Sequence, residues 1–239
     1  MSESWFQFSA GRWVAFALAG AVIASIQIVP AHGWSWLGNG DFAGRAVVVD
    51  GDTLDVGGQR VRLEGIDAPE MAQNCTRADG RPWDCGREAA EALTRLVDGR
   101  EVTCRSEGQD KYDRTLGVCS VDGIDLNAEM VRRGLAWAFV KYSSTYVHEE
   151  GQAREARAGV WQGEAQAPWF YRENRWAVAE SRAPDGCAIK GNISENGRVY
   201  HVPWSPWYGR VKVEPNRGER WFCSEAEAQK ASWRSAGLR

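Results

Sequence analysis

The sequence predicts an α+β protein built on a small β-barrel, with a separate annex at its C-terminal end. Short β-branched runs divided by Asp-Gly and Gly-Gly turns begin the body of the chain, which is typical of a strand meander. Helical patterns then interrupt and follow the strands. From about residue 184 the pattern changes to short strand signals rich in Trp and Cys, which indicates a second folding unit.

Each element of the barrel has its own signal. Strands are predicted at 45–49, 53–57 and 60–66, and two more at 101–105 and 115–121. Apolar residues at helical spacing predict a helix over 87–97, Asp125 opens a second one, and a third is expected over 147–160. Five strands interrupted and followed by about three helices match a five-stranded Greek-key barrel of the OB type. In the annex, Ser224 opens a final helix after several short strands.

The composition divides the chain into five parts. We expect a signal peptide or membrane anchor, a Gly/Trp-rich linker, the barrel domain, a second linker and a small Cys/Trp-containing domain. Their predicted ranges are 1–31, 32–43, 44–165, 166–183 and 184–239.

The N-terminal part carries a targeting signal. Residues 13–29 are uncharged and follow Arg12, a length between that of a signal-peptide core and a short membrane helix. A cleavage site after Ala31 would give a periplasmic or secreted protein, whereas an uncleaved segment would attach it to a membrane. A buried globular helix is the alternative. Either of the first two readings exports the rest of the chain.

Export would place six cysteines in an oxidising compartment, where an even number suggests disulfides. The sequence alone leaves the pairing open, and Cys104 and Cys119 could be reduced core thiols. Local geometry favours the pairs Cys75–Cys85, Cys104–Cys119 and Cys187–Cys223.

Charge is unevenly distributed. Residues 32–180 hold 18 Lys/Arg against 25 Asp/Glu, whereas residues 181–239 hold 10 against 6. An acidic body argues against a protein that coats nucleic acid by bulk electrostatics, because that mode needs many cations. Chemistry on a polyanion would therefore need a local site or a metal.

Acidic residues gather at one predicted rim of the meander. Asp52 begins the second strand and Asp67 ends the third, so their carboxylates should converge. A hard divalent cation relieves the repulsion of such a pair, and Ca²⁺ is the natural candidate. An EF-hand is excluded, because the loop glycine and the last glutamate are missing.

Three further residues, Arg62, Glu70 and Arg114, complete a set of side chains suited to phosphodiester hydrolysis. Arg62 precedes Asp67 on the same strand, Pro69 presents Glu70 in extended geometry, and Arg114 enters another strand. Arginines and a cation stabilise charge on phosphoryl oxygens, while a carboxylate activates or orients water. The alternative is that these residues form ordinary surface ion pairs.

The motifs VVDGDT, RVRLEGIDAPE, DKYDR and EMVRRGLAWA resemble the staphylococcal nuclease (thermonuclease) family, in matching order over roughly residues 44–162. The resemblance implies a calcium-dependent endonuclease of DNA and RNA, single-stranded or denatured, that leaves 3′-phosphates. The tail resembles a small C-terminal extension of some exported nucleases of this family. No feature indicates an obligate protein partner.

The resemblance also implies roles for particular residues. Asp52, Asp67 and the Ala68 backbone carbonyl match the metal ligands, Glu70 the general base, and Arg62 and Arg114 the arginines that clamp the phosphate. Lys111, Tyr112 and Tyr142 match the family's substrate-binding positions, whereas Val140 stands where a second tyrosine is expected. The alternative is a non-catalytic OB module that binds nucleic acid or protein at the cell envelope. A third possibility is an envelope-attached protein whose working part is the tail.

Overall fold

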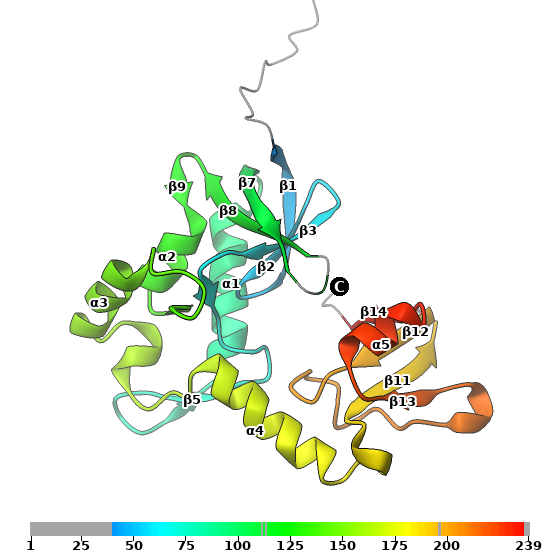
Figure 1. The fold of residues 1–239 in the computed structure, drawn as a ribbon. Coiled ribbons are helices and arrows are strands. Elements are labelled where there is room, and N and C mark those ends of the chain that lie inside the picture. Colours follow the sequence, from blue (N-terminus) through cyan, green and yellow to red (C-terminus); the bar gives the residue numbers. More distant parts are fainter. Residues whose placement is uncertain (1–39, 111, 113, 196, 237–239) are drawn as a thin grey trace, which may run out of the picture. The chain divides into compact units, whose positions relative to one another are not determined.

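The body of the protein is a closed five-stranded barrel (Figure 1). The computed structural model describes residues 40–110, 112, 114–195 and 197–236. Antiparallel neighbours run in the order β3-β2-β1-β7-β8, and a parallel pairing between β3 and β8 closes the barrel. This confirms the α+β barrel fold. The strands are β1 (Asp41–Asp50), β2 (Thr53–Val56), β3 (Gln59–Leu63), β7 (Glu101–Gln109) and β8 (Thr115–Val121).

The first three strands form the predicted meander. Gly57 and Gly58 both have positive φ, at 57° and 91°, as the tight turn between β2 and β3 requires. Strand β1 begins at Asp41, so it starts inside the segment 32–43 that the sequence suggests as a linker. Its register shifts between Val48 and Asp50, just before the turn that leads into β2.

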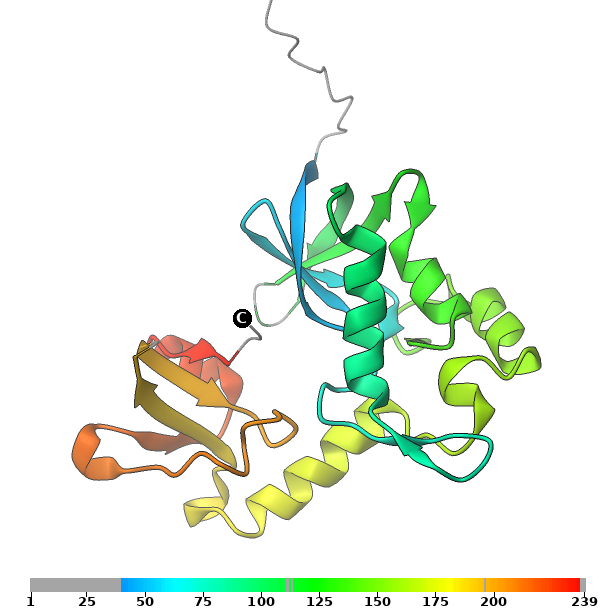
Figure 2. The ribbon, with the colours of Figure 1, turned by 180° about the vertical axis from the view of Figure 1, so that it is seen from behind.

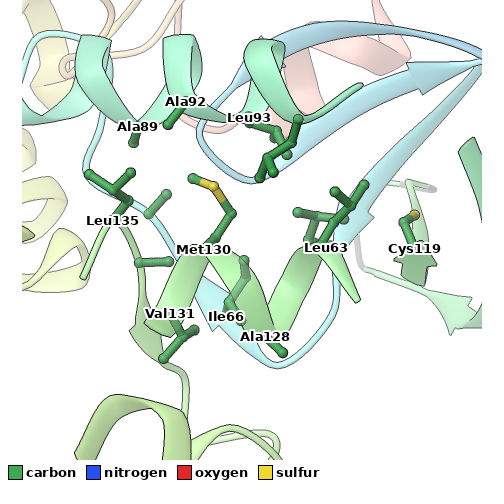
Figure 3. Close-up of a cluster of buried hydrophobic side chains, with 14 of the residues drawn as sticks. Leu63, Ile66, Ala89, Ala92, Leu93, Cys119, Ala128, Met130, Val131 and Leu135 are labelled. Atoms are coloured by element: carbon green, nitrogen blue, oxygen red, sulfur yellow. The ribbon is translucent and has the colours of Figure 1, made fainter. Parts of the chain in front are cut away.

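Three helices accompany the barrel, as predicted. Figure 2 shows α1 lying along the barrel strands, and Figure 3 shows side chains of α1 and α2 meeting in the core. Met130 of α2 is fully buried among Leu93 and Leu63 in this cluster. The third helix ends earlier than expected and gives way to a 3-10 turn. The bounds are α1 (Cys85–Val97), α2 (Leu126–Arg132), α3 (Val147–Glu155) and η1 (Gly159–Gln162).

Short strand pairs complete this part of the chain. The pair β4–β10 extends the end of β3, β5 pairs with β6 in the loop before α1, and β9 follows β8. Their bounds are β4 (Ile66–Asp67), β5 (Cys75–Thr76), β6 (Pro82–Trp83), β9 (Ile124–Asp125) and β10 (Trp137–Ala138).

A long helix follows the barrel where the sequence suggested a linker. Helix α4 (Pro168–Glu180) occupies most of the segment 166–183, with Pro168 in its first turn. Only Pro168 and Ala179 of this helix are buried. Trp169 and Trp176, two helical turns apart, are partly buried and pack against the barrel core and the C-terminal core respectively.

The C-terminal part has its own sheet and its own core. Strands run in the order β13-β11-β12-β14, and Ser224 caps the last helix by accepting a hydrogen bond from the Glu227 backbone N–H at 3.1 Å. Its core consists of Ile189, Tyr200, Phe222, Ala228 and Trp233. The elements are η2 (Pro184–Gly186), β11 (Ile189–Ser194), β12 (Gly197–His201), η3 (Pro215–Arg217), β13 (Arg220–Phe222), α5 (Glu225–Lys230) and β14 (Arg234–Ser235).

All six cysteines form disulfides, in the pairs that local geometry favours. Cys75–Cys85 joins β5 to the start of α1, Cys104–Cys119 crosses between β7 and β8, and Cys187–Cys223 lies in the C-terminal part. Cys104 and Cys119 are therefore not reduced core thiols.

The predicted signal peptide or anchor, residues 1–31, lies outside the described residues. None of the helices within the described ranges combines the length and the apolar character that a membrane span needs.

Candidate active site

The turn between β1 and β2 places Asp52 against the end of β3. Thr53 pairs with Arg62 across the two strands, and the Leu63 backbone N–H donates to the Asp52 carbonyl at 2.8 Å. The Asp52 side chain is buried; its Oδ1 accepts from Thr53 Oγ1 at 3.1 Å and its Oδ2 from the Ala68 backbone N–H at 2.9 Å. Strand register therefore fixes this carboxylate.

Gly51 allows the turn to pack closely. A Cβ at this position would lie 2.7 Å from the Ala68 Cβ and 2.8 Å from the Ala89 Cβ. Contacts that short do not occur between real Cβ atoms, so a side chain would push the turn away from α1 and from the segment after Asp67.

Arg62 joins the two predicted metal-binding carboxylates. Its Nη1 donates to Asp52 Oδ1 at 2.7 Å and its Nη2 to Asp67 Oδ1 at 2.8 Å. Asp67 is completely buried. Burial disfavours the charged guanidinium, but Asp52 and Asp67 outweigh this and raise the pKa of Arg62 above its ordinary value. The structure thus brings together Arg62, Asp52 and Asp67, as the sequence suggested.

A second arginine enters the site from outside the barrel. Arg172, on α4, donates through Nη1 to Asp67 Oδ1 at 3.0 Å and through Nη2 to Asp67 Oδ2 at 2.7 Å. Its Nη1 also lies 2.8 Å from Glu70 Oε1. Sequence reasoning missed this residue, because it lies in the presumed linker and no motif marks it.

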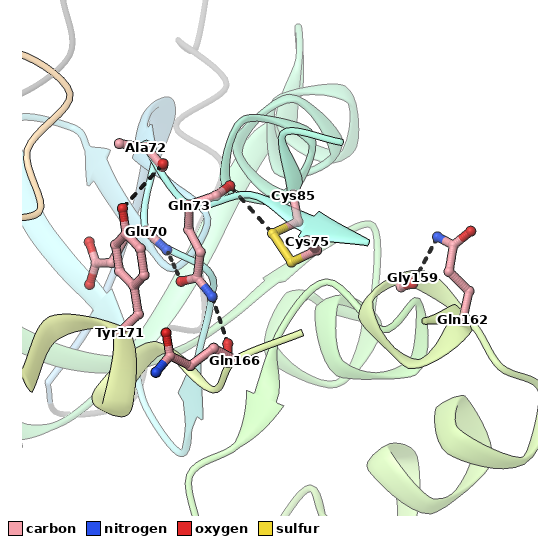
Figure 4. The surroundings of a disulfide bond; sticks show 9 residues. All are labelled: Glu70, Ala72, Gln73, Cys75, Cys85, Gly159, Gln162, Gln166 and Tyr171. Atoms are coloured by element: carbon pink, nitrogen blue, oxygen red, sulfur yellow. Dashed lines mark hydrogen bonds between the residues drawn. A yellow bond between two sulfur atoms is a disulfide. The ribbon is translucent and has the colours of Figure 1, made fainter. Parts of the chain in front are cut away.

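The loop that carries Glu70 is tied down on several sides (Figure 4). The Glu70 backbone N–H donates to Gln73 Oε1 at 3.1 Å, and the Gln73 backbone N–H donates to the Glu70 carbonyl at 2.7 Å. Gln73 is buried, and its Nε2 donates to the Gln166 carbonyl at 2.6 Å. The Cys75–Cys85 disulfide closes the same loop. Glu70 is therefore held by its surroundings.

Gly86 allows the Glu70 loop to touch α1. A Cβ on Gly86 would lie 1.8 Å from the Glu70 carbonyl oxygen, so only glycine fits between them. The Gly86 backbone N–H also donates to the Gln73 carbonyl at 3.3 Å. The start of α1 therefore determines where Glu70 lies.

Burial makes Glu70 a weak acid. Desolvation raises its pKa to about 8, although the Arg172 charge and hydrogen bond oppose the shift. A carboxylate with a pKa near neutral or alkaline pH is a good proton acceptor. This property suits the base expected at this position.

Asp50 is an acidic neighbour that the sequence analysis did not select. Its Oδ1 accepts from the Asp52 backbone N–H at 3.1 Å, and burial together with the Asp52 charge raises its pKa to about 7. The signal was present in the Asp50-Gly51-Asp52 turn itself, since two acids two residues apart flank one glycine.

The donor chemistry of the site fits a hard divalent cation. Two guanidinium groups face four acidic side chains, which leaves negative charge uncompensated when all the acids are ionised. Carboxylate oxygens are the ligands that Ca²⁺ prefers. Within the described residues, no group of three or more acidic, His or Cys side chains forms a ready metal cluster.

Arg114 is not brought to these carboxylates. It pairs with Asp110 at 2.7 Å, and its guanidinium lies 5.4 Å from the centre of the Tyr112 ring. Burial raises the pKa of Asp110, but Arg114 and the backbone N–H groups of Tyr112 and Arg114 more than offset this and lower it. The predicted second clamp therefore has a local partner.

The remaining predicted substrate residues are spread out. Tyr142 is 70% exposed and packs on Phe139 with ring centres 4.9 Å apart, while Val140 is 65% exposed beside it. Lys111 lies outside the described residues. No contact joins Tyr142 to the carboxylate cluster among the residues that the structure describes.

Comparisons with known proteins agree with this geometry. Residues 60–163 match the family model described as staphylococcal nuclease homologue. Micrococcal nuclease of Shigella flexneri is 34% identical over 176 residues, which cover 65% of this chain and 92% of that protein. The chain belongs to the staphylococcal nuclease family. An uncharacterized endonuclease of Escherichia coli is 35% identical over 144 residues, 56% of this chain and 88% of that protein.

Other matches concern smaller parts of this staphylococcal nuclease homologue. The succinoglycan biosynthesis protein ExoI of Rhizobium meliloti is 35% identical over 124 residues, 51% of this chain, and the chain covers 65% of that protein. Residues 169–235 match a second family model, described as ArfC. That match includes α4 and the C-terminal sheet.

Proposed function

We propose that this protein is an exported, Ca²⁺-dependent endonuclease that hydrolyses phosphodiester bonds of DNA and RNA and leaves 3′-phosphates. Its nuclease and endonuclease relatives support the reaction class. The observation that carries the proposal is the Arg62 bridge between Asp52 and Asp67, at 2.7 and 2.8 Å, with Glu70 held beside it. Three disulfides support an oxidising compartment, hence a periplasmic, secreted or membrane-anchored location.

The cation would be held by Asp52, Asp67 and the Ala68 carbonyl. When bound, Ca²⁺ would supply positive charge to the phosphoryl oxygens. The remaining roles in the reaction belong to side chains of the protein. Arg62 has further N–H donors besides the two that bind the aspartates, and these can stabilise charge that develops on the phosphate.

Glu70 acts on water. Its carboxylate accepts a proton as the water oxygen bonds to phosphorus, and the bond from phosphorus to the 5′ oxygen breaks with its electrons going to that oxygen. Burial raises the pKa of Glu70 to about 8, so the ionised form that accepts the proton becomes more populated as the pH rises towards 8. Arg114 would join the phosphate once it leaves Asp110.

The test uses the purified full-length chain and single-stranded DNA, with calcium and with chelator. We expect cleavage in calcium alone, and a roughly 10²-fold or larger loss of kcat in Glu70→Gln. Glu101→Gln, at an exposed glutamate that begins β7, is the matched control and should cleave like wild type. Binding of the DNA without cleavage by wild-type protein would instead support the non-catalytic OB module.

A further inference from the structure

Arg172 donates three hydrogen bonds to two acids of the candidate site. Its two terminal nitrogens contact both oxygens of Asp67, and one of them also contacts Glu70, at 2.7 to 3.0 Å. The planar guanidinium fork matches a carboxylate in this way, and a lysine cannot reproduce it. One side chain therefore fixes the separation of two acids to which different roles are assigned.

Helix α4 is anchored to the Glu70 loop next to this arginine. Tyr171 Oη donates to the Ala72 carbonyl at 3.2 Å, and the Gln166 carbonyl accepts from Gln73 Nε2 at 2.6 Å. Figure 4 shows both bonds reaching the loop from the same side. The segment 166–172, which we call the clasp, thus holds the loop through backbone carbonyls on both partners. Arg172 reaches the acids because the clasp is in place.

Besides its planar guanidinium, Arg172 supplies positive charge next to two buried carboxylates. Asp67 is fully buried and Glu70 is largely buried, and Arg62 pairs with Asp52 and Asp67 but not with Glu70. In the described part of the chain, Arg172 is the one cation within ion-pair distance of Glu70. Removing it would leave that carboxylate free to turn towards water.

We infer that Arg172 is a positioning residue of the nuclease site: from a helix outside the barrel, it holds Asp67 and Glu70 in the arrangement that hydrolysis requires. The inference rests on the proposed function. Its rival is a plug, in which Arg172 occupies the place of the cation and must be displaced before catalysis. A positioning residue raises kcat, whereas a plug lowers activity until calcium removes it.

The test compares Arg172→Gln, Arg172→Lys and Arg172→Ala in the full-length chain. The control is Arg182→Gln, at an exposed arginine just beyond the same helix. At saturating calcium, Arg172→Gln should lose roughly 10- to 100-fold in kcat, the usual effect of removing a residue that orients a metal ligand, with KM little changed. Arg172→Lys should fall between Gln and wild type. Free guanidinium should restore part of the kcat of Arg172→Ala and leave wild type unchanged.

A second measurement does not depend on activity. In chelator, Arg172→Gln should unfold at a lower Tm than wild type, because Asp67 loses a partner while buried, and Arg182→Gln should not. Wild-type or higher kcat in Arg172→Gln would overturn the inference in favour of the plug. If wild type does not cleave DNA, the proposed function fails, and the Tm comparison alone then decides whether Arg172 holds the acids: an unchanged Tm overturns the inference, and a lower one supports it.

Discussion

Arg62 lies in a barrel strand and Arg114 lies just before the strand that pairs with it in parallel, yet only Arg62 reaches the carboxylate cluster. Strands β3 and β8 pair in parallel, with Val61 opposite Thr115. Arg62 lies inside β3 and bridges Asp52 and Asp67, whereas Arg114 lies just before β8 and pairs with Asp110, four residues earlier. A strand fixes the partner of its side chains, but a residue at the end of a loop takes the nearest acid.

Of the two arginines, Arg62, which lies inside a strand, should be the more sensitive to mutation. Arg62→Gln leaves buried Asp52 without an arginine and buried Asp67 with Arg172 alone, so we expect a loss of about 3–5 kcal/mol in the free energy of unfolding. The loss of a phosphate donor should lower kcat by roughly 10²–10³-fold. Chemical denaturation and steady-state cleavage assays measure the two effects. Arg60→Gln, which breaks the exposed pair with Asp55, should change neither by much; an equal loss there would remove the distinction.

Close packing around the Glu70 loop gives the next largest effect. Gly86→Ala would place a Cβ 1.8 Å from the Glu70 carbonyl, so the loop must move. We expect a loss of about 1–3 kcal/mol in the free energy of unfolding, with reduced kcat. Gly151→Ala is the control, because nothing lies within 4 Å of its Cβ and alanine favours a helix. Full activity in Gly86→Ala would show that Glu70 tolerates displacement.

The raised pKa values predict a pH dependence of stability. The pKa is about 7 for folded Asp50 and about 8 for folded Glu70, both above their ordinary values, so the folded protein holds protons that the unfolded chain has released. In chelator, the free energy of unfolding should therefore fall as pH rises from about 5 to about 8, and then level off. Denaturant titrations across this range measure it. Asp50→Asn should reduce the slope, and a rise with pH would contradict the assignment.

The ion pair of Arg114 with Asp110, at the end of a loop, should respond least to mutation. Asp110→Asn removes the charge that holds Arg114, and because the pair is partly exposed the free energy of unfolding should change by less than about 1 kcal/mol. If Arg114 serves the phosphate, its release should lower KM severalfold. The effect should vanish when Arg114→Gln is added, which a double-mutant cycle tests. A higher KM in Asp110→Asn would mean that the pair holds Arg114 in its working position.

The same contrast explains how much could be predicted. Strand period and glycine turns determine register, so the barrel and the meeting of Asp52 with Asp67 followed from the sequence. The position of Arg114 depended on competition between acids at a loop end, which no period encodes. Arg172 lies 105 residues from Asp67, on a helix in which two residues, Pro168 and Ala179, are fully buried. Only the folded chain brings those two residues together.

The two family matches meet between residues 163 and 169, and Arg172 lies on the far side of that boundary from Asp67 and Glu70. Splitting the chain there into two polypeptides would leave every barrel strand intact and would still separate the acids from one of their two arginines. The fragments would have to reassociate to rebuild the cluster. A protein assembled from two recognisable parts can thus have a site that belongs to neither part alone.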